Sequence, residues 1–346
     1  GDGDLDMFKS TDPGTPDAQL ELIRNRGTVY APAWDDSYLS IPSVTINGGN
    51  EDNHYREDQF VFGPYYSSAA DTLYIQRQNG TIDVAEPTGT LSGGAPTFNL
   101  YPNDYEFVVD PTHHEIAPAG IAAADFDGDG VGEIITVYQH KEGNTVYGEL
   151  SVVDQDPVGD TFTYNINDFL TDSDGNTLDP SFIESLAAGD LDGDGRPDLL
   201  VTTANDLDYN VCETWLYRNV TFFADNGTLY YDFRNVGRAD TVFNTDNRYA
   251  RMPALADIDG DSDLDLFVGH RYPDGDNTNL YSYLRFYRNN SPTGLRYTRF
   301  RMTANSMKPL TIPIVFGGSQ VQFVAPQYDL IQNTSGGTLS YPNAVW

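Results

Sequence analysis

The stretch Asp190-Leu-Asp-Gly-Asp-Gly-Arg-Pro-Asp198 places carboxylates at positions 1, 3, 5 and 9 of one short loop. Alternate side chains converge on one point when the backbone wraps tightly around it, and Gly193 and Gly195 permit this wrap. Four carboxylates this close repel one another strongly unless a cation lies between them. Hard oxygen ligands in this number suit calcium better than zinc or copper. The stretch therefore predicts a calcium loop, and an acidic turn without metal is the alternative.

The same loop occurs three times, and its first aspartates, Asp125, Asp190 and Asp257, are 65 and 67 residues apart. In each copy, positions 1, 3, 5 and 9 offer carboxylates and position 7 offers a backbone carbonyl. The predicted ligands are Asp125, Asp127, Asp129, Val131 and Glu133; Asp190, Asp192, Asp194, Arg196 and Asp198; and Asp257, Asp259, Asp261, Asp263 and Asp265.

These loops are predicted to join strands. An EF-hand needs a glutamate at position 12 between two helices, but position 12 holds Thr136, Val201 and Val268 inside strand-like apolar runs. A dockerin would place two loops about one helix apart, which the observed spacing excludes.

A second signature follows each loop: an apolar run that ends near Arg-Asn, then a turn, then Gly-Thr. Each copy then contains four short strands, with the acidic loop between the first and the second. A unit of four antiparallel strands is typical of a β-propeller blade, whereas separate β-sandwiches, the alternative, need about seven strands. We expect one all-β domain over 1–346 with six traceable units, and a longer chain could hold a seventh. The units are 1–36, 37–110, 111–180, 181–247, 248–306 and 307–346.

The acidic loops resemble FG-GAP/VCBS repeats, because two of them open with Ala-Ala-Asp or Leu-Ala-Asp and two are followed by Leu-Leu-Val or Leu-Phe-Val. Repeats of this type build the propeller of integrin α-subunits, and the resemblance implies a calcium-binding propeller with the ligands given above. It also implies that Asp2 and Asp6 are the remnant of a fourth site. Because the first unit lacks its first strand, we expect either upstream sequence or a strand from a neighbouring molecule to complete it.

Composition limits the partners. The 346 residues carry a formal net charge of −33, which repels nucleic acid and anionic membranes, and no apolar run is long enough to span a membrane. The single cysteine, Cys212, allows no internal disulfide, so we expect bound metal to stabilise the fold instead. Many of the aspartates are then ligands and turn formers, although an acidic surface also suits a salty medium.

Asn-x-Ser/Thr sequences fall at the end of the Arg-Asn strand or in the turn after it, where we expect exposure and N-glycosylation. They begin at Asn79, Asn219, Asn226, Asn289 and Asn333.

The sequence contains no nucleophile elbow, phosphate loop or Cys–His pair, so we expect no enzymatic activity. The predicted function is a secreted or cell-surface adhesion or assembly module. Its partners would be proteins or glycans, and strand exchange could produce self-assembly. A lectin is the alternative, and a polysaccharide-active enzyme is a weaker one.

Overall fold

A computed structural model describes the chain in segments that together cover most of the predicted strands. The described residues are 7–10, 19–24, 39–45, 58–64, 72–92, 95–106, 116–142, 145–155, 161–165, 170–171, 176–204, 212–238, 249–256, 264–273, 280–289, 297–303, 310–316, 319–325 and 329–330.

The described residues form β-strands and one short 3-10 turn, η1, as expected for a chain rich in β-branched and aromatic residues. The strands are β1 (Met7–Ser10), β2 (Gln19–Ile23), β3 (Leu39–Thr45), β4 (Gln59–Gly63), β5 (Thr72–Gln76), β6 (Thr81–Ser92), β7 (Ala95–Glu106), β8 (Ile116–Ala124), β9 (Glu133–Glu142), β10 (Thr145–Gln155), β11 (Thr161–Asn165), β12 (Leu170–Thr171), β13 (Ile183–Gly189), β14 (Asp198–Ala204), β15 (Cys212–Asn219), β16 (Phe222–Phe223), β17 (Leu229–Tyr230), β18 (Phe233–Arg238), β19 (Tyr249–Ala256), β20 (Asp265–Pro273), β21 (Leu280–Asn289), β22 (Tyr297–Thr303), β23 (Leu310–Phe316), β24 (Ser319–Ala325) and β25 (Asp329–Leu330), and η1 spans Pro180–Phe182.

The strands pair into successive sheets, which are antiparallel except where β12 runs parallel to β18. The prediction of an all-β fold built from antiparallel sheets is confirmed. In chain order the sheets are β1-β2-β3, β4-β5-β6-β7, β8-β9-β10-β11, β13-β14-β15-β18 with β12 at its outer edge, the small hairpin β16-β17, β19-β20-β21-β22 with β25 at its edge, and β23-β24.

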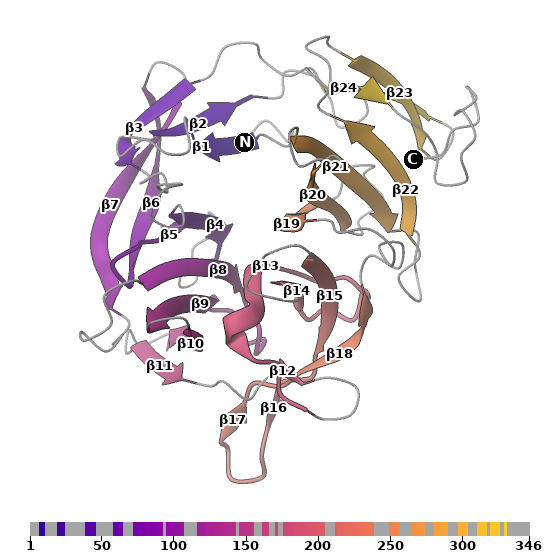
Figure 1. The fold of residues 1–346 in the computed structure, drawn as a ribbon. Coiled ribbons are helices and arrows are strands. Elements are labelled where there is room, and N and C mark those ends of the chain that lie inside the picture. The colour runs from indigo at the N-terminus through magenta and orange to yellow at the C-terminus, as the bar shows by residue number, and fades with distance from the viewer. Residues whose placement is uncertain are drawn as a thin grey trace.

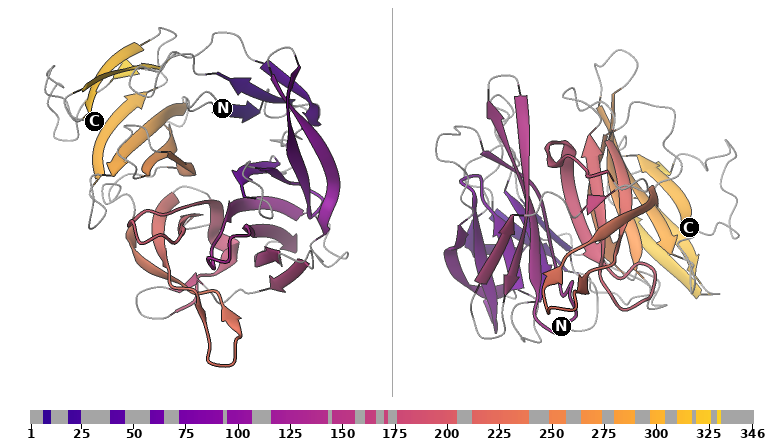
Figure 2. Two further views of the ribbon diagram at one scale, coloured as in Figure 1. Left: turned by 180° about the vertical axis from the view of Figure 1, so that it is seen from behind. Right: turned by 90° about the horizontal axis from the view of Figure 1, so that it is seen from below.

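The sheets follow one another around a common centre (Figure 1), and the other two views show the same succession (Figure 2). The first strands of four consecutive sheets contact one another in chain order: β4 contacts β8, β8 contacts β13, and β13 contacts β19. Each of these sheets therefore begins at the centre and extends outward.

Strand pairing differs from the predicted units in two places. β3, expected to open the unit 37–110, pairs with β2 instead, and the segment between β3 and β4 lacks the acidic ladder that precedes the second strand elsewhere. β25, from the last predicted unit, pairs with β22. The exact division of the chain into six units stays a prediction.

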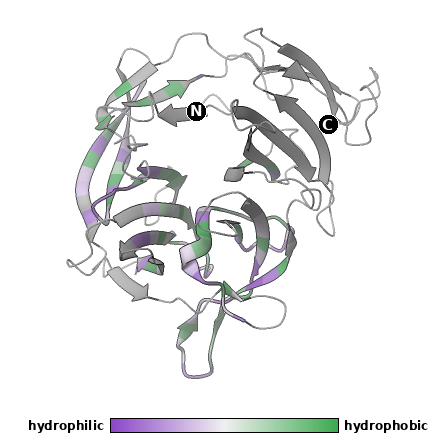
Figure 3. Cartoon of the chain, in the orientation of Figure 1, coloured by the Kyte–Doolittle hydropathy of each residue, from purple (hydrophilic) through white to green (hydrophobic). Residues whose placement is uncertain are grey.

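Apolar side chains are buried between neighbouring sheets. One cluster joins sheet β8–β11, through residues such as Ile135 and Val152, to the following sheet through Leu199 and Phe233. Two further clusters join β4–β7 to the sheets before and after it. Apolar and polar bands alternate along strands such as β7 (Figure 3). Because burial lies between sheets, no sheet is expected to be stable alone.

The central strands approach so closely that two glycines are required. A Cβ on Gly63 of β4 would lie 2.5 Å from the Cβ of Ala123 in β8, and one on Gly120 of β8 would lie 3.1 Å from the backbone nitrogen of Leu186 in β13. Both contacts lie where one sheet meets the next.

We predict that Gly63→Ala lowers the free energy of unfolding by about 1–3 kcal/mol, the usual cost of overpacking. Chemical denaturation at fixed calcium would measure this loss. The double variant Gly63→Ala/Ala123→Gly removes the nearest clash and should recover part of the loss. A single variant as stable as the wild type would show that β4 and β8 are farther apart than described.

Candidate metal centres

Two of the three predicted loops lie within the described residues, and each joins the first and second strands of its sheet. The loop 125–133 connects β8 to β9, and the loop 190–198 connects β13 to β14. Of the predicted ligands in the third loop only Asp265 is described; it begins β20 and is fully buried. The other predicted ligands, Asp2, Asp6, Asp257, Asp259, Asp261 and Asp263, lie outside the described residues.

The first loop is wrapped by hydrogen bonds from its own backbone to its carboxylates. Asp125 accepts from the amides of Gly128 (2.7 Å) and Gly130 (3.0 Å), and Asp127 accepts from Asp129 (3.0 Å). The two glycines have φ of 82° and 89°, a conformation that other residues rarely adopt. Asp129 accepts from Val131 (2.8 Å), and Glu133 accepts from Phe126 (2.6 Å).

The second loop repeats this pattern at equivalent positions. Asp190 accepts from the amides of Gly193 (2.8 Å) and Gly195 (2.9 Å), and Asp194 accepts from Arg196 (3.0 Å). Asp192 accepts from Asp194, and Asp198 accepts from Leu191, both at 3.2 Å. The repeated acidic spacing therefore produces the same local fold twice.

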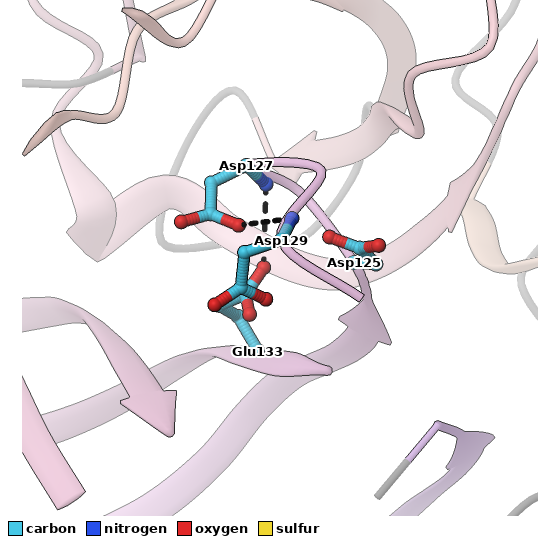
Figure 4. A group of neighbouring side chains, drawn as sticks. All are labelled: Asp125, Asp127, Asp129 and Glu133. Carbon is cyan, nitrogen blue, oxygen red and sulfur yellow. Dashed lines mark hydrogen bonds between the residues drawn. The ribbon is translucent and has the colours of Figure 1, made fainter. Parts of the chain in front are cut away.

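Four carboxylates converge in the first loop (Figure 4). Asp125, Asp127, Asp129 and Glu133 each present an oxygen, and these oxygens lie within 4.8 Å of one another. Glu133 is fully buried, and its Oε1 has no hydrogen-bond partner among the described residues, although its Oε2 accepts from backbone amides. A buried carboxylate oxygen left in this state is costly unless a cation binds it.

The first loop raises the pKa values of two of its acids above their ordinary range. Burial first, and then the charges of Asp127, Asp154 and Asp125, raise the pKa of Glu133 to about 9. Burial and the charges of Asp129, Asp154 and Asp125 raise the pKa of Asp127 to about 6. Oxygen donors with this much mutual repulsion match a hard divalent cation such as calcium, which would be held by these side chains.

The second loop brings fewer carboxylates together. Asp190, Asp192 and Asp194 converge, whereas Asp198 is occupied by hydrogen bonds from the amides of Leu191 and Asn219. Burial raises the pKa of Asp198 to about 7. A backbone-carbonyl contribution from Val131 and Arg196 stays a prediction.

The sheet β4–β7 carries no acidic loop but has a buried ion cluster at the corresponding edge. Arg77 contacts Asp58, the residue before β4, at 2.7 Å, and Asp83 at 2.6 Å. All three residues are buried. This cluster could not be predicted from the sequence, because Asp58, Arg77 and Asp83 come together only through strand pairing.

Asn219, one of the predicted glycosylation sites, is only 1% exposed, which contradicts the expectation that it lies on the surface. Its Nδ2 donates to the carbonyl of Phe126 in the first loop (2.8 Å), and its backbone amide donates to Asp198 (3.0 Å). Asn219 thus links the two loops, the first through its side chain and the second through its backbone. Asn79 and Asn226 are exposed in turns, as expected. The side chain of Asn289 and all of Asn333 lie outside the described part.

We predict that the metal-free protein loses stability as the pH rises. Because the folded pKa values of Asp127, Asp198 and Glu133 are raised, the stability linked to them is complete below the ordinary carboxyl pKa and is lost as the pH passes about 6, 7 and 9. Saturating calcium should remove this loss, since it neutralises the ionised carboxylates.

Thermal unfolding between about pH 5 and 9, with protein stripped of metal on a chelating resin, would measure this effect. A metal-free protein that became more stable over this range would contradict the assignment of buried, metal-directed carboxylates.

Comparison with known proteins agrees with this geometry. No curated protein matches the chain. Separately, the described residues contain no helix that is long and apolar enough to cross a membrane. The model of the FG-GAP repeat family matches residues 182–211. This match covers β13, the acidic loop and β14, with the same wrapped carboxylates as the loop before it. Residues 182–211 therefore match the FG-GAP repeat, and the loop 125–133 repeats the same wrapped geometry.

Proposed function

We propose that this protein is a calcium-stabilised β-propeller that acts as a non-enzymatic interaction module outside the cell or at its surface. The observation that carries the proposal is the repeated unit of strand, wrapped acidic loop and strand in successive sheets around one centre. FG-GAP repeats are typical of such modules.

The propeller arrangement is supported by the central strands. β4, β8, β13 and β19 contact one another in sequence order, and the apolar clusters lie between sheets. Antiparallel sheets that begin at a common centre and bury their faces against their neighbours are the defining features of propeller blades.

Calcium is supported by the donor set. The two described loops offer oxygen ligands alone, on backbones already wrapped by hydrogen bonds. Since these loops exist only in the folded chain, binding of calcium favours folding. A chain whose only cysteine precludes an internal disulfide can gain extracellular stability in this way.

The hairpin β16-β17 is the described surface best suited to contact a partner. It projects outward from its sheet (Figure 1) and exposes Phe222, Phe223 and Tyr230 by 49%, 59% and 49%. Phe222 and Tyr230 stack with ring centroids 5.5 Å apart, so the aromatic surface is ordered before any partner arrives. Exposed apolar clusters of this kind mark interaction sites.

A lectin is the second candidate, and the same hairpin favours it because aromatic rings also stack on sugars. Trp215, in contrast, packs against the core between sheets and is not available for this role. A second copy of the chain, joined by strand exchange, is a further candidate partner.

We predict that calcium raises the melting temperature of the wild type, since a single site at a hundredfold excess over Kd contributes about 2.7 kcal/mol. Asp127→Asn should lower the melting temperature in calcium while leaving it unchanged or higher in metal-free buffer, because it removes one repelling charge. Asp225→Asn, at the exposed tip of the hairpin, is the matched control and should change neither value. Equal losses with and without calcium, or no bound calcium by elemental analysis, would reject the calcium assignment.

We predict that Phe223→Ser and Tyr230→Ser reduce partner binding without lowering the melting temperature. Phe182→Ser is the control, because Phe182 is similarly exposed on η1, away from the hairpin. A glycan array separates the candidates: binding lost in the hairpin variants but kept in the control supports the lectin. If no glycan binds, sedimentation of wild type and variants tests self-association, and unaltered self-association in the hairpin variants would exclude the hairpin as that interface.

A further inference from the structure

In the two sheets with described acidic loops, one position on the third strand lies opposite the acid that begins the second strand. The register that pairs Val153 with Ile134 places Asp154 opposite Glu133. The register that pairs Tyr217 with Leu199 places Arg218 opposite Asp198. Directly opposed residues of antiparallel strands project on the same side of the sheet, so this position faces the acidic loop.

In the second loop this position carries a cation that already contacts the carboxylates. Arg218 reaches Asp192 at 2.7 Å and Asp194 at 3.2 Å, and its side chain is 46% exposed. Two of the three converging acids therefore have an internal partner. A bound metal ion must displace or share this guanidinium.

In the first loop the same position carries a further acid. Asp154 lies opposite Glu133 in the strand register, so its carboxylate adds negative charge beside the four converging acids. No arginine contacts the four converging carboxylates among the described residues, and Oε1 of Glu133 lacks a hydrogen-bond partner there. The negative charge of this loop is therefore not balanced by an arginine among the described residues.

The sheet β4–β7 shows the opposite extreme. The register that pairs Gln76 with Gln59 places Arg77 opposite Asp58, and the two side chains form a buried ion pair. Asp83 completes the coordination of the guanidinium. Asp58 precedes β4, the first strand of this sheet, and Arg77 follows β5, the second. Here an arginine opposite the acid provides the positive charge that a metal ion would supply.

We propose that the residue opposite the acid that begins a strand determines how that acid is neutralised and how tightly each loop binds calcium: Asp154 makes the loop 125–133 the tight site, Arg218 makes the loop 190–198 a weaker one, and Arg77, opposite Asp58, replaces the metal ion in sheet β4–β7. The inference rests on the proposed calcium binding. The physical reason is charge, because each added carboxylate strengthens a calcium site and an arginine near the ligands competes with the ion.

Hydrogen exchange measured by mass spectrometry during a calcium titration can resolve the two loops by their own peptides. In the wild type, peptides covering 125–133 should become protected at about tenfold lower calcium than those covering 190–198. Asp154→Asn should raise the first midpoint by about tenfold and leave the second unchanged. Arg218→Gln should lower the second midpoint and leave the first unchanged. Asp225→Asn, the surface control, should move neither.

A structural role for Asp154 alone would destabilise the protein in both conditions. The proposed role instead predicts a higher melting temperature for Asp154→Asn in metal-free buffer and a lower one at limiting calcium. If this variant fails to fold, the calcium midpoint of Arg218→Gln, which changes an exposed side chain, still tests the inference.

Coincident midpoints in the wild type, or an Arg218→Gln midpoint equal to that of the wild type, would overturn the inference while leaving calcium binding intact. Absence of calcium-dependent protection in every loop peptide would instead overturn the proposed function, and the inference with it.

Discussion

A carboxylate buried at the start of a strand must be matched by positive charge or hydrogen bonds, and this requirement organises the molecule. Asp58, Glu133, Asp198 and Asp265 all occupy that place and are almost inaccessible to solvent. Asp58 is matched by an arginine, and Asp198 by two backbone amides. Glu133 retains an oxygen without a hydrogen-bond partner in the described structure. Burial of an unmatched carboxylate is among the most costly events in folding. Each buried carboxylate must therefore be stabilised by an arginine, by backbone amides or by a bound cation.

The first acidic loop packs against the next sheet, so the conformation of the loop affects how one sheet packs on another. Phe126, the second residue of the first loop, packs edge-on against Phe233 of the next sheet at 5.5 Å. Behind the loops, glycines allow the central strands to approach one another. A metal ion that orders such a loop also orders the face against which the next sheet packs, and this explains why stability and metal binding should be inseparable here.

Much of this organisation could be predicted from sequence because it is local. The spacing of Asp190, Asp192 and Asp194 with two glycines fixes both the wrap of the loop and the convergence of the oxygens. Interactions across segments could not be predicted in this way. The pairing of Arg77 with Asp58 and Asp83, the opposition of Asp154 to Glu133, and the pairing of β3 with β2 all depend on strand register. The burial of Asn219 could not be predicted for the same reason. Its Asn-Val-Thr sequence has the form of a surface turn, but its side-chain amide donates a hydrogen bond to a carbonyl of the preceding sheet.

The burial of Asn219 makes its glycosylation depend on whether the protein has already folded. A sugar attached to Nδ2 would replace one of its two hydrogens and would need room beside the side chain, but Asn219 is buried and its Nδ2 lies against the carbonyl of Phe126. Attachment at this residue and native packing are mutually exclusive, while the exposed Asn226 nearby accepts either state. In a cell that modifies such sequences, the ratio of occupancy at these two asparagines would record whether folding of this region was completed before the modifying enzyme arrived.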